Sequence, residues 1–177
     1  EPIVWRNDED LDEHGLLGNL FDEHRKWAGM VASKFGEIPL GYTEWTISGQ
    51  LAIAAGRLDY YALQEYTAEV NPGTAEWPYT VRPDLWVQTG ANSDLSSYVF
   101  EIKQAGIRLS DDGPSIKRTL SDQLSEARCK LHDYEREAAY HCSLVVAPIN
   151  VKVSDLPEAS VYGKAIATLR GSVCESF

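Results

Sequence analysis

The chain has 177 residues, of which 44% are hydrophobic, with five Trp and nine Tyr; this is typical of one globular domain and excludes a disordered chain. Its 16 Lys and Arg against 27 Asp and Glu give a net charge of −11, the wrong sign for a protein that covers phosphates with positive charge. No stretch approaches the roughly 18 apolar residues of a membrane span, and three cysteines without framework spacing indicate reduced thiols. We therefore expect one cytoplasmic domain over residues 1–177, with no membrane contact.

The negative charge is concentrated at the start of the chain. Residues 1–23 hold eight acidic residues and one basic residue, which accounts for −7 of the −11. We expect an acidic N-terminal segment over about residues 1–15, which is either a solvated surface or an arm that contacts a protein partner or shields a basic groove. Between residues 101 and 136, seven basic residues match seven acidic ones, so a locally basic face is possible there.

Two helices are predicted in the first third of the chain. Apolar residues from Leu16 to Phe35 recur at intervals of three and four, which predicts an amphipathic helix. Helical spacing resumes from Leu51 to Glu65, although Gly56 is unfavourable inside a helix. A short strand around Tyr66–Val70 is predicted to follow.

A hairpin is predicted next. Val81–Gln88 and Ser97–Gln104 have strand character, and the residues between them are rich in turn formers.

The last part of the chain predicts a helix, a strand and a helix. Leucines and other apolar residues step by four and three from Leu120 to Tyr134, as in a helix. Cys142–Ile149 is a nearly continuous apolar run, which predicts a strand covered on both faces. Ala159–Leu169 is predicted to close the domain as a helix. The order of elements predicts an α/β fold with a mixed β-sheet flanked by helices.

Charged residues interrupt the two predicted strands of the hairpin. Successive side chains of a strand alternate between its faces, so Glu101 and Lys103 share one face and Ile102 points to the other. If the strand that begins at Val81 pairs beside them, Asp84 faces the same point. Two carboxylates and one ammonium group then converge.

This combination suits a hard divalent cation. Mg²⁺ prefers carboxylate, carbonyl and water oxygens, and Asp84, Glu101 and the backbone carbonyl of Ile102 supply such a set. A bound cation lowers the pKa of a coordinated water, and Lys103 would orient that nucleophile or stabilise charge on a phosphate. Phosphodiester hydrolysis is the reaction that these groups suit.

The same residues carry a resemblance to a known family. Pro83-Asp84, followed 17 residues after the aspartate by Glu101-Ile102-Lys103, resembles the signature of the PD-(D/E)xK nucleases, the restriction-endonuclease-like superfamily. The resemblance implies that the pattern lies on adjacent strands of a mixed sheet, that the acids bind Mg²⁺ or Mn²⁺, and that the lysine assists attack by water. It also implies a nucleic-acid substrate, with DNA favoured. The order of elements is compatible with this family over about the last two thirds of the chain.

The resemblance implies two further site residues. The family tends to place an acid on the helix before the first core strand, and Glu65 is the first candidate because it lies on the predicted apolar stripe, with Glu69 and Glu23 as competitors. Many members have a Gln on the helix after the motif, and Gln123 lies on the inward side of that predicted helix. Gln104 follows the lysine directly but points to the other face of a regular strand.

Other interpretations stay open. Asp84, Glu101 and Lys103 would form an ordinary cross-strand ion pair if their sheet face were solvated. At the level of the protein, the alternatives to a nuclease are a catalytically inactive binding or assembly module and an effector domain of a larger defence protein. Double-strand cleavage needs two sites, which makes a homodimer a reasonable expectation for an active enzyme.

Overall fold

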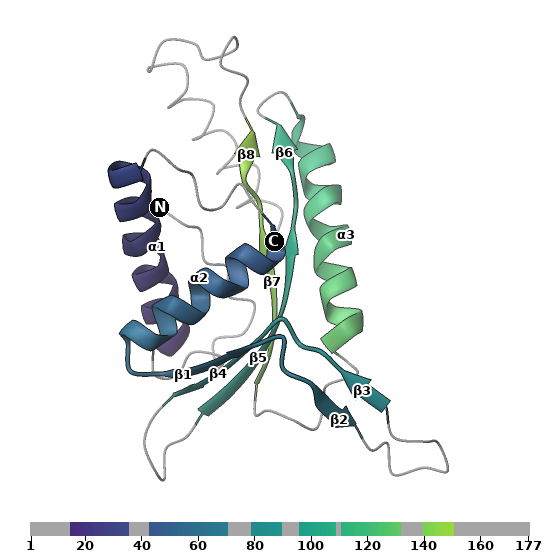
Figure 1. The fold of residues 1–177 in the computed structure, drawn as a ribbon. Helices are drawn as coiled ribbons and strands as arrows, with labels where there is room; N and C mark the ends of the chain where they lie inside the picture. The colour runs from purple at the N-terminus through teal and green to yellow at the C-terminus, as the bar shows by residue number, and fades with distance from the viewer. Residues whose placement is uncertain are drawn as a thin grey trace.

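The computed structural model describes residues 15–35, 43–70, 79–89, 96–108, 111–131 and 140–150. These residues form an α/β arrangement of a four-stranded mixed sheet flanked by three helices (Figure 1). The helices are α1 (Leu16–Phe35), α2 (Glu44–Arg57) and α3 (Gly113–Leu131). The strands are β1 (Tyr61–Gln64), β2 (Ala68–Val70), β3 (Tyr79–Val81), β4 (Leu85–Thr89), β5 (Ser96–Gln104), β6 (Ile107–Arg108), β7 (Tyr140–Val146) and β8 (Ile149–Asn150).

The main sheet has the strand order β1-β4-β5-β7. β1 and β4 are antiparallel, β4 and β5 are antiparallel, and β5 and β7 are parallel. A parallel pair needs a crossover connection, and α3 lies between β5 and β7 in the chain. Two small sheets accompany it: β2 pairs with β3, and β6 pairs with β8 beyond the ends of β5 and β7 (Figure 1).

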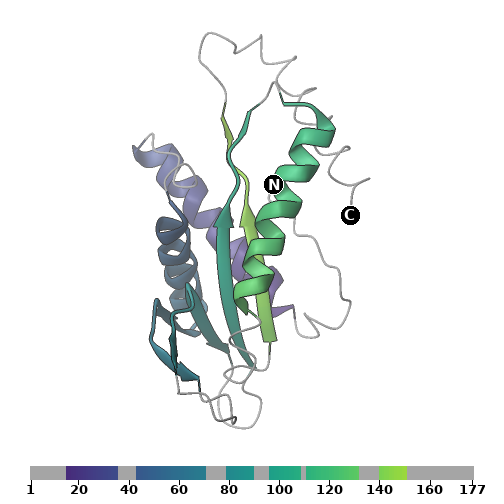
Figure 2. The same cartoon turned by 90° about the vertical axis from the view of Figure 1, so that its right-hand side faces the viewer.

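Helices cover both faces of the main sheet. Figure 1 shows α1 and α2 on one face and α3 on the other, and Figure 2 shows α3 lying along β5 and β7. Leu20, Ile47 and Leu51 of the first two helices pack against Phe100 and Ile102 of β5. Burial of each such side chain contributes about 1.5–3 kcal/mol to folding. This face of the sheet is the main hydrophobic core.

The opposite face of β5 packs against α3. Val99 of β5 and Leu131 of α3 form the buried centre of a second, smaller cluster. Odd-numbered residues of β5 therefore face α3 and even-numbered ones face α1 and α2, which confirms the alternation predicted from the sequence.

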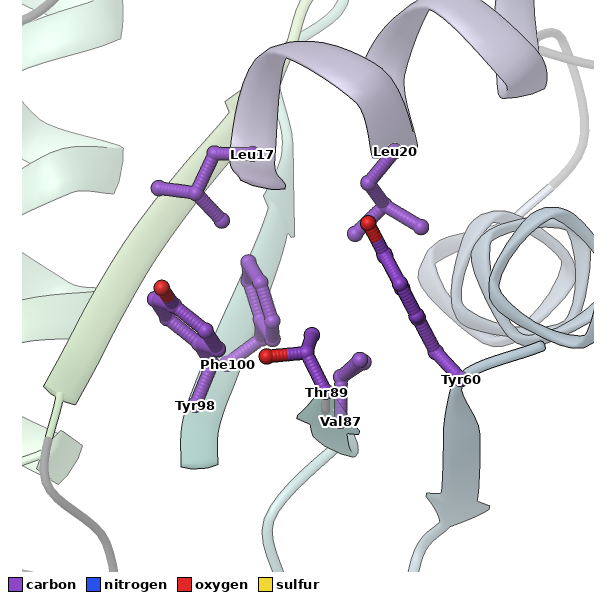
Figure 3. Close-up of a pocket in the computed structure, with 7 residues that line it drawn as sticks. All are labelled: Leu17, Leu20, Tyr60, Val87, Thr89, Tyr98 and Phe100. Atoms are coloured by element: carbon purple, nitrogen blue, oxygen red, sulfur yellow. The ribbon is translucent and has the colours of Figure 1, made fainter. Parts of the chain in front are cut away.

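The interface between α1 and the sheet is filled. Figure 3 shows Leu17 and Leu20 of α1 beside Tyr60, which directly precedes β1, and beside four sheet residues, Val87, Thr89, Tyr98 and Phe100. The space between these side chains leaves no room for a water molecule. A wider, open hollow of about 540 Å³ is lined by Trp27, residues of α2 and Gln64. Neither hollow includes Glu101 or Lys103.

The second predicted helix was wrong at both ends. α2 begins at Glu44, where the hydroxyl of Thr43 caps it by accepting a hydrogen bond of 3.2 Å from the amide of Thr46, and it ends at Arg57. The chain then passes through Asp59, which has a left-handed φ of 58°, and residues 61–64 form β1. Apolar and aromatic residues around this turn fit helical spacing and strand alternation equally well.

Glu65 is affected by this correction. It was predicted on the apolar stripe of a helix, but it follows β1 in a bend with a φ of 42°. The first predicted strand of the hairpin was also wrong in extent, because β3 ends at Val81 and β4 begins only at Leu85. Pro83 lies in the break, and a proline has no amide hydrogen to donate to a strand ladder.

The remaining elements agree with the prediction in type. β5 and α3 lie where the sequence predicted a strand and a helix, although α3 begins earlier, at Gly113. β7 is a strand, as predicted, but it ends at Val146 and not at Ile149, it is only partly buried, and among the described strands it lies at the edge of the sheet. The predicted helix Ala159–Leu169 lies outside the described residues. None of the described helices is long and apolar enough to cross a membrane.

Candidate active site

The candidate site begins with two charged residues buried in β5. Glu101 is 1% exposed and Lys103 is 5% exposed, and both face α3. Nζ of Lys103 lies 3.3 Å from Oε1 of Glu101. Burying an ion pair costs several kcal/mol per ion unless its geometry is good and further polar groups satisfy it, so the surroundings of this pair decide what it can do.

Asp84 joins this pair from the neighbouring strand. Leu85 pairs with Phe100 in the antiparallel register, which sets Asp84 beside Glu101 at the next position. Oδ2 of Asp84 accepts a hydrogen bond of 2.6 Å from the amide of Ile102. Burial raises the pKa of Asp84; the Ile102 hydrogen bond opposes this, and the nearby Glu101 carboxylate adds to it. A second carboxylate beside Glu101 makes the site attractive to a cation.

Lys130 and Glu126 of α3 also contact the buried pair of β5. Nζ of Lys130 lies 2.7 Å from Oε1 of Glu101, and Oε1 of Glu126 lies 3.6 Å from Nζ of Lys103. Residues four apart lie on one face of a helix, so α3 presents both groups to β5. Sequence reasoning missed both. The sequence signal that could have found Glu126 and Lys130 is their i,i+4 spacing, each directly before an apolar residue, Ala127 or Leu131.

Glu44 reaches the site from the start of α2. Its Oε1 accepts a hydrogen bond of 3.0 Å from the amide of Gln104, and its Oε2 lies 3.7 Å from Nζ of Lys103. It is an acid on the helix before the first strand of the main sheet, the place for which Glu65 was predicted. The sequence did not single it out, because the helix was expected to begin only at Leu51.

The backbone of Glu65 lies near Asp84, whereas the carboxylate of Glu65 lies near Arg82. Its amide donates a hydrogen bond of 3.2 Å to the carbonyl of Asp84, whereas its Oε2 lies 3.8 Å from Nε of Arg82. Of its two competitors, Glu23 lies on α1 and forms an ion pair with Arg57, and Glu69 lies in β2.

Gln123 lies on α3, as predicted, and is partly buried. It precedes Glu126 by three residues, so the two share a face of the helix. That face also carries Lys130, which places Gln123 one turn before the residues that contact Glu101 and Lys103.

Lys103 is held in its charged form. Burial opposes its charge, but the carboxylates of Glu101 and Glu44 outweigh this effect and raise its pKa. An amine with a raised pKa is protonated at neutral pH and does not abstract a proton there. Lys103 is therefore suited to stabilising negative charge and not to acting as a general base.

The oxygen atoms of the site fit a hard cation. Because the amide of Ile102 points to Asp84, its carbonyl also lies on that side of β5, since both groups of a strand residue face the same neighbour. Oε1 of Glu101 is buried and, within the described part of the chain, receives no aligned hydrogen bond, although two ammonium groups are at ion-pair distance. Two carboxylates, a carbonyl and waters form a typical Mg²⁺ environment.

Over the residues with described placement, no group of three or more His, Cys, Asp or Glu is arranged to hold a metal ion. Mg²⁺ is usually bound through one or two carboxylates with several waters, so the Asp84–Glu101 pair has to be judged by its own geometry.

Comparison with known proteins identifies no relative of this chain. A scan against protein-family models and searches of curated proteins and of solved structures found no match to this chain. The function is therefore inferred from the residues of the site and their arrangement.

Proposed function

We propose that this protein is a Mg²⁺-dependent nuclease that hydrolyses phosphodiester bonds, with the PD-(D/E)xK pattern as its active site. The observation that carries the proposal is that Asp84, directly before β4, accepts a hydrogen bond from the amide of Ile102, between the buried Glu101 and Lys103, whose side chains lie 3.3 Å apart. A solvated cross-strand ion pair would not bury Glu101.

The order of elements supports a restriction-endonuclease-like fold as part of this proposal. The chain runs through a helix, the antiparallel strands β1, β4 and β5, the helix α3 and then β7 parallel to β5. This matches what the resemblance implies, namely a motif on adjacent strands of a mixed sheet that helices flank.

Each residue of the site has a distinct task in this proposal. Asp84, Glu101 and the carbonyl of Ile102 hold the cation, which when bound supplies a Lewis acid and lowers the pKa of a coordinated water. Lys103 stabilises the negative charge that builds on the phosphate. Glu44 acts as a positioning residue, because it contacts both Nζ of Lys103 and the amide of Gln104.

Nucleic acid is the proposed substrate, with DNA favoured. The net charge of −11 opposes binding of a polyanion, so positive charge near the site has to supply the contacts. α3 carries four basic residues against two acidic ones, and Lys117, Arg118 and Arg128 are exposed on it. A phosphate backbone that lies along α3 would therefore reach the site.

The test is a cleavage assay with labelled duplex DNA, single-stranded DNA and RNA, in Mg²⁺ and in EDTA. We expect Mg²⁺-dependent cleavage that falls by about 10²–10³-fold in Asp84→Asn and in Lys103→Met, as when a transition-state contact is lost. Lys34→Met removes an exposed charge from α1, on the opposite face of the sheet from α3, and is the matched control. Equal cleavage by wild type and both site variants, or no cleavage of any substrate, would overturn the proposal.

A second candidate function is a catalytically inactive binding or assembly module with this fold. It is favoured by the net charge and by the two ammonium groups that already lie near Glu101. It predicts that no substrate is cut and that Asp84→Asn leaves binding of a partner unchanged.

A further inference from the structure

We propose that Lys130 is a built-in counter-ion of Glu101, which a divalent cation must displace, and that Lys130 thereby sets the metal affinity of the site. The proposal rests on the proposed metal site and adds a competitor from the protein's own chain.

The first argument is position. Nζ of Lys130 lies 2.7 Å from Oε1 of Glu101, closer than Nζ of Lys103 at 3.3 Å. Oε1 is the buried oxygen that a cation would use, and neither amine is aligned to form a hydrogen bond with it. The ammonium group of Lys130 thus lies next to the atom at which a metal ion would bind.

The second argument is that Lys130 is free to leave and Lys103 is not. The side chain of Lys130 is 50% exposed, whereas that of Lys103 is 7% exposed. An exposed ammonium returns to water at little cost. Lys130 belongs to the last turn of α3. The buried Leu131 anchors that turn against Val99, so displacement needs only a side-chain movement.

The third argument is charge. Asp84, Glu101, Glu44 and Glu126 are four carboxyl groups, and Lys103 and Lys130 are two ammonium groups. Fully ionised, the cluster has a net charge of −2, and exchange of the Lys130 ammonium for a divalent cation changes it to −1. Exchange of one ammonium for a divalent cation therefore improves the charge balance, and removal of Lys130 removes the group that opposes binding.

The experiment measures Mn²⁺ binding to the full chain after EDTA treatment, without nucleic acid, by following free Mn²⁺ with electron paramagnetic resonance. We expect Lys130→Met to bind Mn²⁺ about tenfold more tightly than wild type, because a like charge next to the ligand oxygen is removed. Lys130→Arg keeps the charge and should stay within about twofold of wild type. Arg128→Met removes a charge from the same turn of α3, and should also stay within that range.

Further variants locate the effect and control for folding. Asp84→Asn in the Lys130→Met background should abolish the tight binding. Lys130→Gln, whose side chain is polar and uncharged, should reproduce the Lys130→Met result and keeps the test valid if Lys130→Met folds poorly. Urea unfolding in EDTA confirms that each variant is folded.

The outcomes separate this inference from the nuclease proposal. Unchanged or weaker Mn²⁺ binding by Lys130→Met and Lys130→Gln, or equal tightening by Arg128→Met, would overturn the inference even if wild type cleaves nucleic acid in an Asp84-dependent way. Tighter binding without cleavage of any substrate would support the inference and overturn the nuclease. Absence of Mn²⁺ binding by all proteins would overturn both.

Discussion

Lys103 is contacted by acids from three different elements. Glu101 belongs to its own strand, Glu126 to α3, and Glu44 to the first turn of α2. Glu44 differs from Glu126 in that it also binds the backbone of β5, at the amide of Gln104. Glu44 therefore fixes the position of the end of β5, and of Lys103, relative to the start of α2.

Glu44→Gln tests this positioning role. The amide oxygen of Gln can still accept the Gln104 hydrogen bond, so we expect stability to be nearly unchanged while cleavage falls about tenfold, as is typical when a supporting contact is lost. Loss of the Glu44 carboxylate lowers the pKa of Lys103, so cleavage should be lost at a lower pH on the alkaline side than in wild type. The measurement is kcat/KM for a labelled duplex as a function of pH.

Glu65→Gln is the matched comparison, because Glu65 was the acid that the sequence favoured. It should cleave at close to the wild-type rate. If Glu65→Gln loses activity and Glu44→Gln does not, then Glu44 has no role and the acid from the start of the sheet is Glu65.

The residues of the site divide into those that local pattern predicts and those that it does not. Asp84, Glu101 and Lys103 could be brought together from the sequence, because strand alternation and pairing of neighbouring strands are local properties. Glu44 could not, because it reaches the site from the start of a helix that the sequence placed wrongly. The spacing of Glu126 and Lys130 indicates a shared helix face, but it does not show that this face meets β5.

At the scale of elements, the start of α2 is the most consequential boundary. Thr43 caps the helix by accepting from the amide of Thr46, and Glu44 follows directly. The sequence contains this capping residue. However, the apolar residues keep helical spacing from Leu51 to Glu65, so the helix was predicted to begin and to end too late. Residues 61–64 became β1 because they pair with β4, a long-range contact that helical spacing does not report.

Thr43→Ala should destabilise the protein by about 1 kcal/mol, the usual cost of losing a Thr cap. Thr43→Ser retains a hydroxyl and should stay close to wild type. The free energy of unfolding from urea titration, followed by circular dichroism, measures both. Equal stability of Thr43→Ala and wild type would mean that the cap does not contribute and that α2 is held by its packing alone.

At the scale of the whole molecule, a partly buried polar contact joins α1 to α2. Nε2 of His24 lies 3.0 Å from Oε1 of Gln50. Burial lowers the pKa of His24, and the hydrogen bond to Gln50 only partly offsets this. The folded protein therefore holds this histidine in its neutral form.

This arrangement predicts a pH-dependent stability. An unfolded histidine takes up a proton near pH 6.5, whereas folded His24 resists until a lower pH, so its contribution is present above pH 6.5 and is lost as the pH falls through the folded pKa. Urea unfolding of wild type and His24→Gln at pH values from 8 to 5 measures the effect. The difference in stability between the two proteins should shift in favour of His24→Gln below about pH 6.5.

A parallel pH dependence in the two proteins would contradict the predicted role of His24. Because the other titrating groups are common to both, they cancel in the comparison.

The class of fold could be predicted from the sequence, since the order of periodic segments indicates a mixed sheet between helices. The strand order could not, because the parallel pairing of β5 with β7 is a contact between segments separated by α3. The acidic N-terminal segment and the last predicted helix lie outside the described residues, so these parts of the prediction stay predictions.

The central claim is that a divalent cation binds between Asp84 and Glu101. Crystals of the protein soaked in Mn²⁺, measured at a wavelength at which manganese scatters anomalously, test it most directly. We predict an anomalous peak about 2.0–2.2 Å from carboxylate oxygens of Asp84 and Glu101, which disappears in Asp84→Asn. A map without a peak there, with Lys130 still against Glu101 at saturating Mn²⁺, would contradict the account.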